Sequence, residues 1–178
     1  DIDNLKQGLA AANVRSGFLP VVAPGSVVPE RRDEHYAGDE AYTFAVAEAL
    51  RSEYRAIVDA GLTLQVDDAH LPGAYERIVP PGTLADYRKW AEIRVAALNH
   101  ALEGIPEDRC RYHICWGSWS GPHVGDVPLK DIADLVLQVR AGGYLIEGAN
   151  ARHEHEWCVW EKVKLPAGKV LIPGVVSH

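Results

Sequence analysis

Short apolar runs alternate along this chain with longer segments of helical periodicity. The apolar runs are each bounded by Gly, Pro or charged residues, and they lie at residues 17–23, 62–68, 111–116, 144–147 and 169–176. Such bounded runs of branched and aromatic residues are typical of strands. The sequence therefore predicts five strands, and because the runs contain apolar residues at successive positions, we expect them to be apolar on both faces.

Between these runs, apolar residues recur every three or four positions, which indicates helices. The clearest helix spans 39–60, where Asp39 and Glu40 suit a first turn and Gly61 suits a stop. Thr83, three residues before Asp86, predicts the capped start of a second long helix that ends at residue 104. Two further helices are expected at 1–13 and from 128 to 141, with loops at 26–38 and 75–82.

Strands that alternate with helices predict a parallel sheet, because a parallel pair needs a long crossover. Five such strands fit either an open doubly wound sheet or part of a barrel. No Gly-rich phosphate loop follows any of the strands, and a (β/α)8 barrel needs about 250 residues against the 178 of this chain. We therefore predict a single domain over 1–178 that is an incomplete TIM-type (β/α)8 barrel of about five βα units, and we expect the native protein to be longer.

The charge balance excludes several classes of partner. The chain has 25 Asp and Glu against 18 Lys and Arg and a net charge of -7, so it lacks the basic surface of a nucleic-acid-binding protein. No apolar run approaches the roughly 20 residues of a membrane span. Three Cys, an odd number, suit a reducing compartment, so we expect a cytoplasmic protein with small-molecule partners. Monomer and homo-oligomer both remain open.

Polar residues gather where the predicted strands end. Asp67 and Asp68 end the second strand, Glu147 ends the fourth, and His178 follows the last. In parallel α/β folds these strand ends form one rim, where active sites assemble. We therefore expect these side chains to approach one another.

The third strand carries His113 and Cys115, two residues apart and hence on one face. Imidazole nitrogen, thiolate sulfur and carboxylate oxygen are all zinc ligands. His-x-Cys alone is a weak signal, because a buried Cys beside a hydrogen-bonded His is common. With Glu147 on the next strand, the pattern predicts a zinc site of His113, Cys115 and Glu147.

Other candidates are given less specific roles. Trp116, directly after Cys115, is expected to wall a substrate pocket, although an aromatic residue at a strand end is commonly part of the core. Cys110 and Cys158 are interpreted as structural. The His-Glu-His-Glu-Trp segment at 153–157 looks like a metal cluster, but residues i and i+2 diverge on a helix, so a surface or capping role is predicted.

Four segments resemble the cobalamin-independent methionine synthase family. Residues 64–68 (LQVDD) are similar to the family's Ile-Gln-Ile-Asp-Glu strand, and His113-x-Cys115 resembles its His-x-Cys zinc strand. Residues 145–147 resemble its Glu-bearing strand, and 172–178 resemble a Gly-Pro-Gly-Val segment that leads to a His. The resemblance is strongest to the shorter single-barrel relatives, which include the epoxyalkane:coenzyme M transferases.

This resemblance implies zinc-dependent alkyl or methyl transfer to a thiol in a TIM-type barrel. It implies that His113, Cys115 and Glu147 bind zinc, that Asp67 holds the amino group of homocysteine, and that His178 does acid–base work. Asp68 and Trp116 are expected beside Asp67 in substrate binding. The family's fourth zinc ligand, a downstream Cys, would lie beyond this sequence. An insertion at 116–126 leaves the thiol and the donor open, with a methyl-folate and an epoxide both considered.

Two other functions are compatible with the same residues. A zinc hydrolase would use metal-bound water as nucleophile and Asp67 or Asp68 as base. A barrel of this kind could also bind a ligand without turnover, because fold does not determine function.

Overall fold

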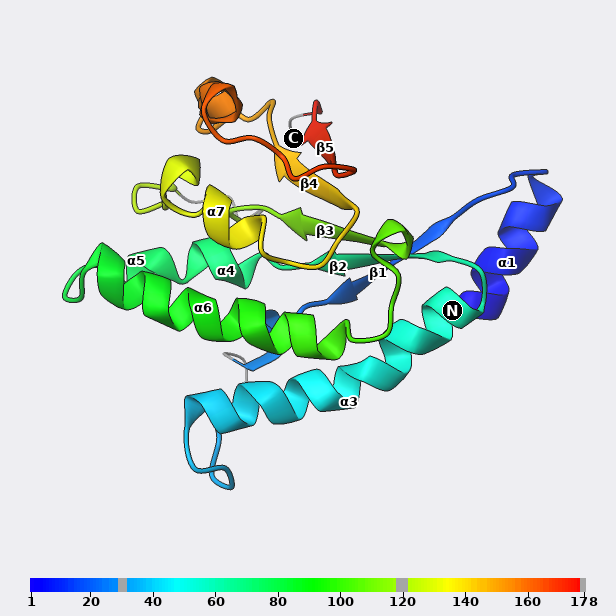
Figure 1. The fold of residues 1–178 in the computed structure, drawn as a ribbon, viewed down its shortest axis with the longest axis horizontal. Helices are drawn as coiled ribbons and strands as arrows, with labels where there is room; N and C mark the ends of the chain where they lie inside the picture. The colour runs from blue at the N-terminus through cyan, green and yellow to red at the C-terminus, as the bar shows by residue number, and fades with distance from the viewer. Residues whose placement is uncertain (29–31, 118–121, 177–178) are drawn as a thin grey trace.

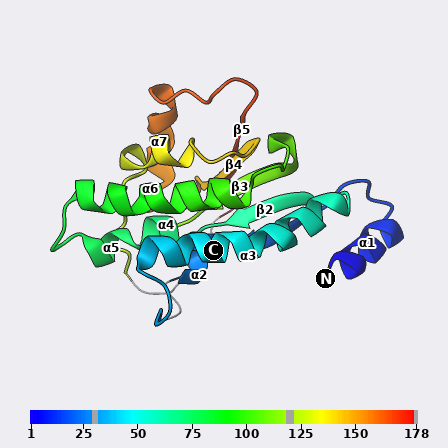
Figure 2. The same ribbon diagram turned by 60° about the horizontal axis from the view of Figure 1, so that its bottom comes forward.

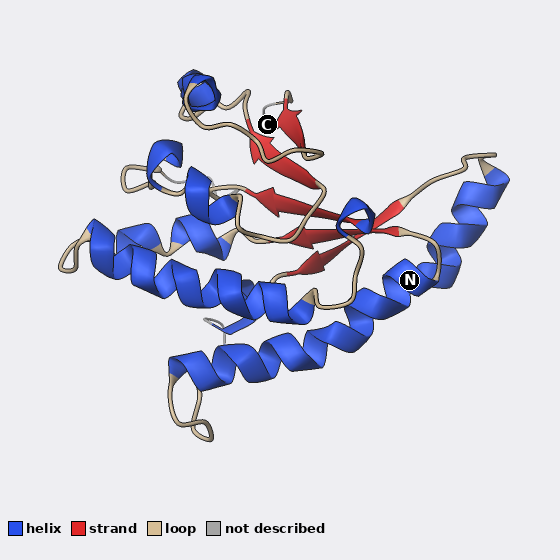
Figure 3. Ribbon diagram, viewed as in Figure 1, coloured by secondary structure: helices blue, strands red, loops and turns tan. Residues whose placement is uncertain are grey.

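The computed structural model describes residues 1–28, 32–117 and 122–176 of the chain. Its centre is one parallel sheet (Figure 3), whose strands follow sequence order (Figure 1). The strands are β1 (Phe18–Val22), β2 (Thr63–Asp67), β3 (Cys110–Ile114), β4 (Gly143–Glu147) and β5 (Val170–Gly174). All five predicted strands are thus confirmed, although β3 ends one residue before Cys115.

The sequential strand order decides between the two predicted architectures. A doubly wound sheet reverses its strand order in the middle and carries helices on both faces. Here each crossover joins neighbouring strands, and the two long helices run together along one face of the sheet (Figures 1 and 2). The fold is therefore a mixed α/β fold wound in one direction, which is compatible with part of a (β/α) barrel.

The two long helices are α3 (Asp39–Asp59) and α6 (Leu84–Ala101), which pack against each other. The start of α6 has the predicted capping box. The amide of Asp86 donates to Thr83 Oγ1 at 3.2 Å, and the amide of Thr83 donates to the Asp86 carboxylate at 2.9 Å. In the described ranges, neither these nor any other helix is long and apolar enough to cross a membrane.

The remaining helices are short, and two predictions about them were wrong. The expected loop at 75–82 begins with a helical turn, and the helix expected from residue 128 is broken. The break falls at Ile132, whose φ of -130° departs from helical geometry. The short helices are α1 (Ile2–Ala11), α2 (Pro24–Val27), α4 (His70–Gly73), α5 (Tyr75–Ile78), η2 (Glu107–Arg109), η3 (Leu129–Asp131), α7 (Ala133–Val136) and η4 (Glu154–Glu161).

The two faces of the sheet differ, which corrects the expectation of strands that are apolar on both faces. The helix-covered face is apolar and at most 3 % exposed at Val66, Tyr112, Ile114, Tyr144 and Ile146. The alternate positions point to the other face, where Asp67, His113, Leu145 and Glu147 remain partly exposed. The polar side chains of the strands are therefore collected on the face that α3 and α6 leave uncovered.

The capping box gives a stability prediction. Replacing Thr83 with Ala removes the oxygen that accepts the Asp86 amide, so the free energy of unfolding should fall by about 1 kcal/mol. Ser52→Ala, at an exposed position inside α3, should leave it unchanged or slightly higher, since Ala favours helix. Urea-induced unfolding of the two variants measures both, and equal effects would contradict a stabilising role for the cap.

Candidate functional site

The register of the parallel strands brings the candidate residues to one rim. Asp67 lies opposite His113, and His113 lies opposite Leu145 on the next strand. Neighbours in register share a face of the sheet, and Cys115 and Glu147 return to that face two residues later. Asp67 and Glu147 are the last residues of β2 and β4, and Cys115 directly follows β3, so these three lie at the C-terminal edge of the sheet, as the sequence predicts.

The three predicted zinc ligands line one pocket of about 320 Å³. The other residues that line it are Gly117, Leu145, Ile146, Gly174 and Val176. Within the described ranges, no group of three or more His, Cys, Asp and Glu side chains is close enough to hold a metal ion.

Two of these side chains are already oriented by neighbours. Nδ1 of His113 lies 3.2 Å from the carbonyl oxygen of Leu145. When that nitrogen donates, the lone pair is on Nε2, which is the tautomer that a metal ligand needs. Asn150 Nδ2 donates to Glu147 Oε1 at 2.7 Å and fixes the carboxylate.

The second carboxylate oxygen of Glu147 is unsatisfied. Oε2 is buried and has no hydrogen-bond partner among the residues that the structure describes. Leaving a buried carboxylate oxygen unpaired costs free energy, and a bound cation would remove that cost. Nitrogen, sulfur and oxygen donors of these types are ones that zinc accepts, but in the described residues they are not gathered closely enough to form a metal site.

Cys115 lies in an environment that disfavours a free thiolate. Burial raises the pKa of the Cys115 thiol, a hydrogen bond from the Gly117 backbone opposes this, and the negative charges of Glu147, Asp67 and Asp68 raise it further. The thiol is therefore neutral at pH 7 unless a cation is bound beside it.

Asp67 lies opposite His113 in the register of β2 and β3, but it does not line this pocket. Gln65 Nε2 donates to Asp67 Oδ1 at 2.9 Å, and Arg111 Nε donates to Gln65 Oε1 at 2.7 Å. The Arg111 guanidinium in turn stacks over the ring of Phe18, 3.6 Å from its centroid. This chain of contacts along the uncovered face positions the Asp67 carboxylate.

Asp68 points to the opposite, helix-covered face and is 2 % exposed. It accepts hydrogen bonds from Ser26 Oγ and the Tyr112 hydroxyl, both at 2.8 Å, and from the Leu71 amide at 3.2 Å. Burial raises the pKa of Asp68, while these hydrogen bonds and the charge of Arg94 lower it. Asp68 thus links β2 to β3 and α2 through hydrogen bonds, and it lies away from the pocket lined by His113, Cys115 and Glu147.

Comparison with known proteins gives one partial relative. No family model matches the chain. Over 90 residues, which are 50% of this chain, it is 27% identical to 2-hydroxypropyl-CoM lyase of Xanthobacter autotrophicus (strain ATCC BAA-1158 / Py2). The matched segment is 20% of that protein's length, so the chain spans about a fifth of it. This similarity does not show the methionine synthase family.

Trp116 was expected to line the substrate pocket, but the structure places it beside a different cavity. Its ring is 3 % exposed, its Nε1 donates to the carbonyl of Val127 at 2.8 Å, and it borders a separate cavity of about 270 Å³ with Ser26 and Arg77. It does not line the pocket of the three candidate ligands. His178 lies outside the described residues.

Of the two remaining cysteines, Cys110 is buried at 2 % exposure, which raises the pKa of its thiol to about 12, and Cys158 is exposed. Neither lines the pocket.

Residues 153–157 were predicted to have a surface or capping role, which agrees with the exposed His155, whereas His153 is buried at the N-cap position of η4 and makes no side-chain capping hydrogen bond. His155 is exposed, whereas His153 is 5 % exposed and is hydrogen-bonded to Asp126 and Glu156. Its partner Asp126 lies 27 residues earlier, in the loop that follows β3. Sequence spacing carries no signal for such a contact.

The opposite orientation of the two aspartates can be tested by removing each carboxylate. Asp68→Ala leaves the Tyr112 hydroxyl and the Leu71 amide buried without a partner, so the free energy of unfolding should fall by about 3 kcal/mol or more. Asp67→Ala removes one hydrogen bond at a partly exposed site and should cost about 1 kcal/mol or less. Urea-induced unfolding compares the two, and a larger loss for Asp67→Ala would contradict the assignment.

Proposed function

We propose that this chain forms the zinc-binding part of an enzyme that joins a thiol to an alkyl group. The observation that carries the proposal is that His113, Cys115 and Glu147 line one pocket while a buried oxygen of Glu147 has no partner in the described residues. Each is a natural zinc donor; the His113 ring contacts the Leu145 carbonyl and the Glu147 carboxylate accepts from Asn150, which is the kind of support that zinc ligands receive. A fourth ligand would come from outside the described ranges.

Zinc bound to these three side chains would supply a Lewis acid that lowers the pKa of a substrate thiol and favours its nucleophilic form. The protein side chains supply the rest. Glu147 and Cys115 would balance the metal charge, and Asp67, held by Gln65, would bind a cationic group of the thiol substrate or accept its proton. His178 remains a candidate for acid–base work from the sequence.

The name of the partial relative favours an epoxide as the alkyl donor. A 2-hydroxypropyl thioether is what forms when a thiol sulfur attacks the terminal carbon of epoxypropane. The new bond is carbon–sulfur, the bond that breaks is carbon–oxygen, and the oxygen takes up a proton to become the hydroxyl group. Leu145 and Val176 give the pocket an apolar wall on which a short alkyl group could lie.

The metal content of the full-length protein tests the ligand assignment. We expect about one zinc per chain in the unmodified protein and a large loss of zinc in Cys115→Ser and in Glu147→Gln, because each removes a ligand. Cys158→Ser alters an exposed cysteine outside the pocket and serves as the matched control that retains zinc. Full zinc retention in Cys115→Ser would refute the site.

The reaction is tested with defined thiol and donor pairs. The full-length protein should consume coenzyme M with epoxypropane, or homocysteine with methyl-tetrahydrofolate, and Cys115→Ser should reduce the rate by about 100-fold or more. Mass spectrometry of the thioether identifies the product. If the protein binds zinc and hydrolyses a substrate without forming a thioether, it is a hydrolase. If it binds zinc and shows no turnover, it is a ligand-binding protein.

A further inference from the structure

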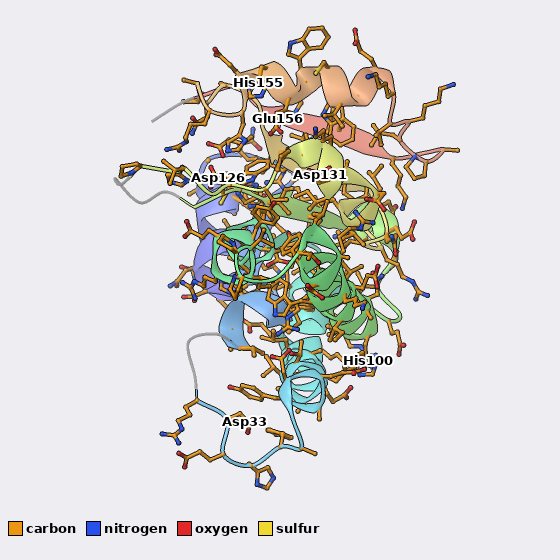
Figure 4. All side chains as sticks on the ribbon, turned by 90° about the vertical axis from the view of Figure 1, so that its left-hand side faces the viewer. Asp33, His100, Asp126, Asp131, His155 and Glu156 are labelled. Atoms are coloured by element: carbon orange, nitrogen blue, oxygen red, sulfur yellow. The ribbon has the colours of Figure 1, made fainter. Side chains whose placement is uncertain are left out.

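His153, just before η4, is held by two carboxylates at once. Its Nδ1 lies 2.8 Å from Glu156 Oε2, and its Nε2 lies 3.0 Å from Asp126 Oδ2. Figure 4 shows that the two carboxylates come from different parts of the chain, Asp126 from the loop after β3 and Glu156 from η4. At 5 % exposure the imidazole is largely shielded from water.

Two carboxylates, one at each ring nitrogen, favour the charged form of the ring. A neutral imidazole carries one N–H and could donate to only one of the two carboxylates, so the other would face a lone pair. The imidazolium donates to both. Its ring also lies flat on Trp116, with centroids 3.8 Å apart and planes at 16°, an arrangement in which a cation is attracted to the indole face.

The cluster connects the two segments that flank the candidate zinc pocket. Asp126 is also bonded to His123 Nδ1 at 3.2 Å, and the second oxygen of Glu156 accepts from the Leu129 amide at 2.6 Å. Residues 116–117 and 122–129, the described parts of the segment after β3, are thereby attached to the segment that follows β4. Trp116 is the residue next to Cys115, so the stack restrains the backbone that carries the thiol.

We propose that His153, in its imidazolium form, is a positioning residue that holds Trp116 and thereby fixes Cys115 at the pocket. The catalytic purpose of this restraint rests on the proposed function, whereas the ionic stack of His153 on Trp116 does not. The charged groups that face His153 are Asp126 and Glu156, with His123 behind Asp126.

The stack should be sensitive to pH in a defined direction. Burial lowers the pKa of His153, but the hydrogen bonds to Glu156 and Asp126 outweigh it and raise the pKa above its ordinary value. A group with a raised folded-state pKa stabilises the protein fully below its unfolded value of about 6.5, and this contribution is lost as pH rises through the folded-state pKa. The connection between the two segments should therefore loosen as the pH rises above the ordinary pKa of a histidine.

Tryptophan fluorescence of the full-length protein tests the stack directly, because a stacked imidazolium quenches indole emission. We expect emission to rise with pH, with a midpoint above 6.5. The change should disappear in Trp116→Phe and in His153→Gln and persist in His155→Gln, the exposed neighbour. In Asp126→Asn, which keeps the shape and one acceptor, the midpoint should move to lower pH. The same titration in His153→Gln as in His155→Gln would overturn the proposal.

Alkylation of Cys115 tests the positioning role in the protein as purified. In a Cys158→Ser background Cys115 is the accessible thiol, since Cys110 is buried. At pH 7, the rate at which iodoacetamide alkylates Cys115 should differ about tenfold between the variant with His153→Gln added and the variant with His155→Gln added. A tenfold difference corresponds to the loss of one charge-assisted hydrogen bond. If the two variants are alkylated at equal rates while the fluorescence titration behaves as expected, the stack of His153 on Trp116 is supported and the positioning role is refuted. Absence of zinc from the unsubstituted protein, with the difference in alkylation rate retained, would count against the zinc assignment alone.

Discussion

The parallel register of β2, β3 and β4 determines where each candidate side chain lies. Asp67, His113 and Leu145 are neighbours in that register, so a shift by one residue would exchange the polar and apolar faces of all three strands. The apolar alternate residues, such as Tyr112 and Ile114, must face α3 and α6 to be buried. Burial of one face thus forces the polar side chains onto the other, where they form the pocket.

Much of the fold could be predicted from the sequence because it depends on local patterns. The strands were visible as bounded apolar runs. Gly61 marked the C-terminal end of α3, and the Thr83 cap marked the start of α6. The order of the strands was not visible, since the same pattern suits a doubly wound sheet. The break in the helix after Pro128 was also missed, because the apolar spacing continues through Ile132 while the backbone does not.

The candidate site, like the fold, could be predicted from the sequence only in part. His113, Cys115 and Glu147 were predicted to share a rim, and strand alternation together with register suffices to bring them to one pocket. The same alternation indicates that consecutive residues such as Asp67 and Asp68 face opposite ways, and the sequence interpretation overlooked this. The contacts of His153 depend on loops that follow two different strands, so no local pattern could reveal them.

The central claim is that the pocket of His113, Cys115 and Glu147 holds zinc for thiol chemistry. The most direct measurement is X-ray absorption at the zinc edge of the full-length protein, with and without a substrate thiol. The account predicts a mixed shell of sulfur and nitrogen or oxygen donors, with zinc–sulfur distances of about 2.3 Å, and one additional sulfur when the thiol is added. A shell without sulfur, or one that does not change when the thiol is added, would contradict it.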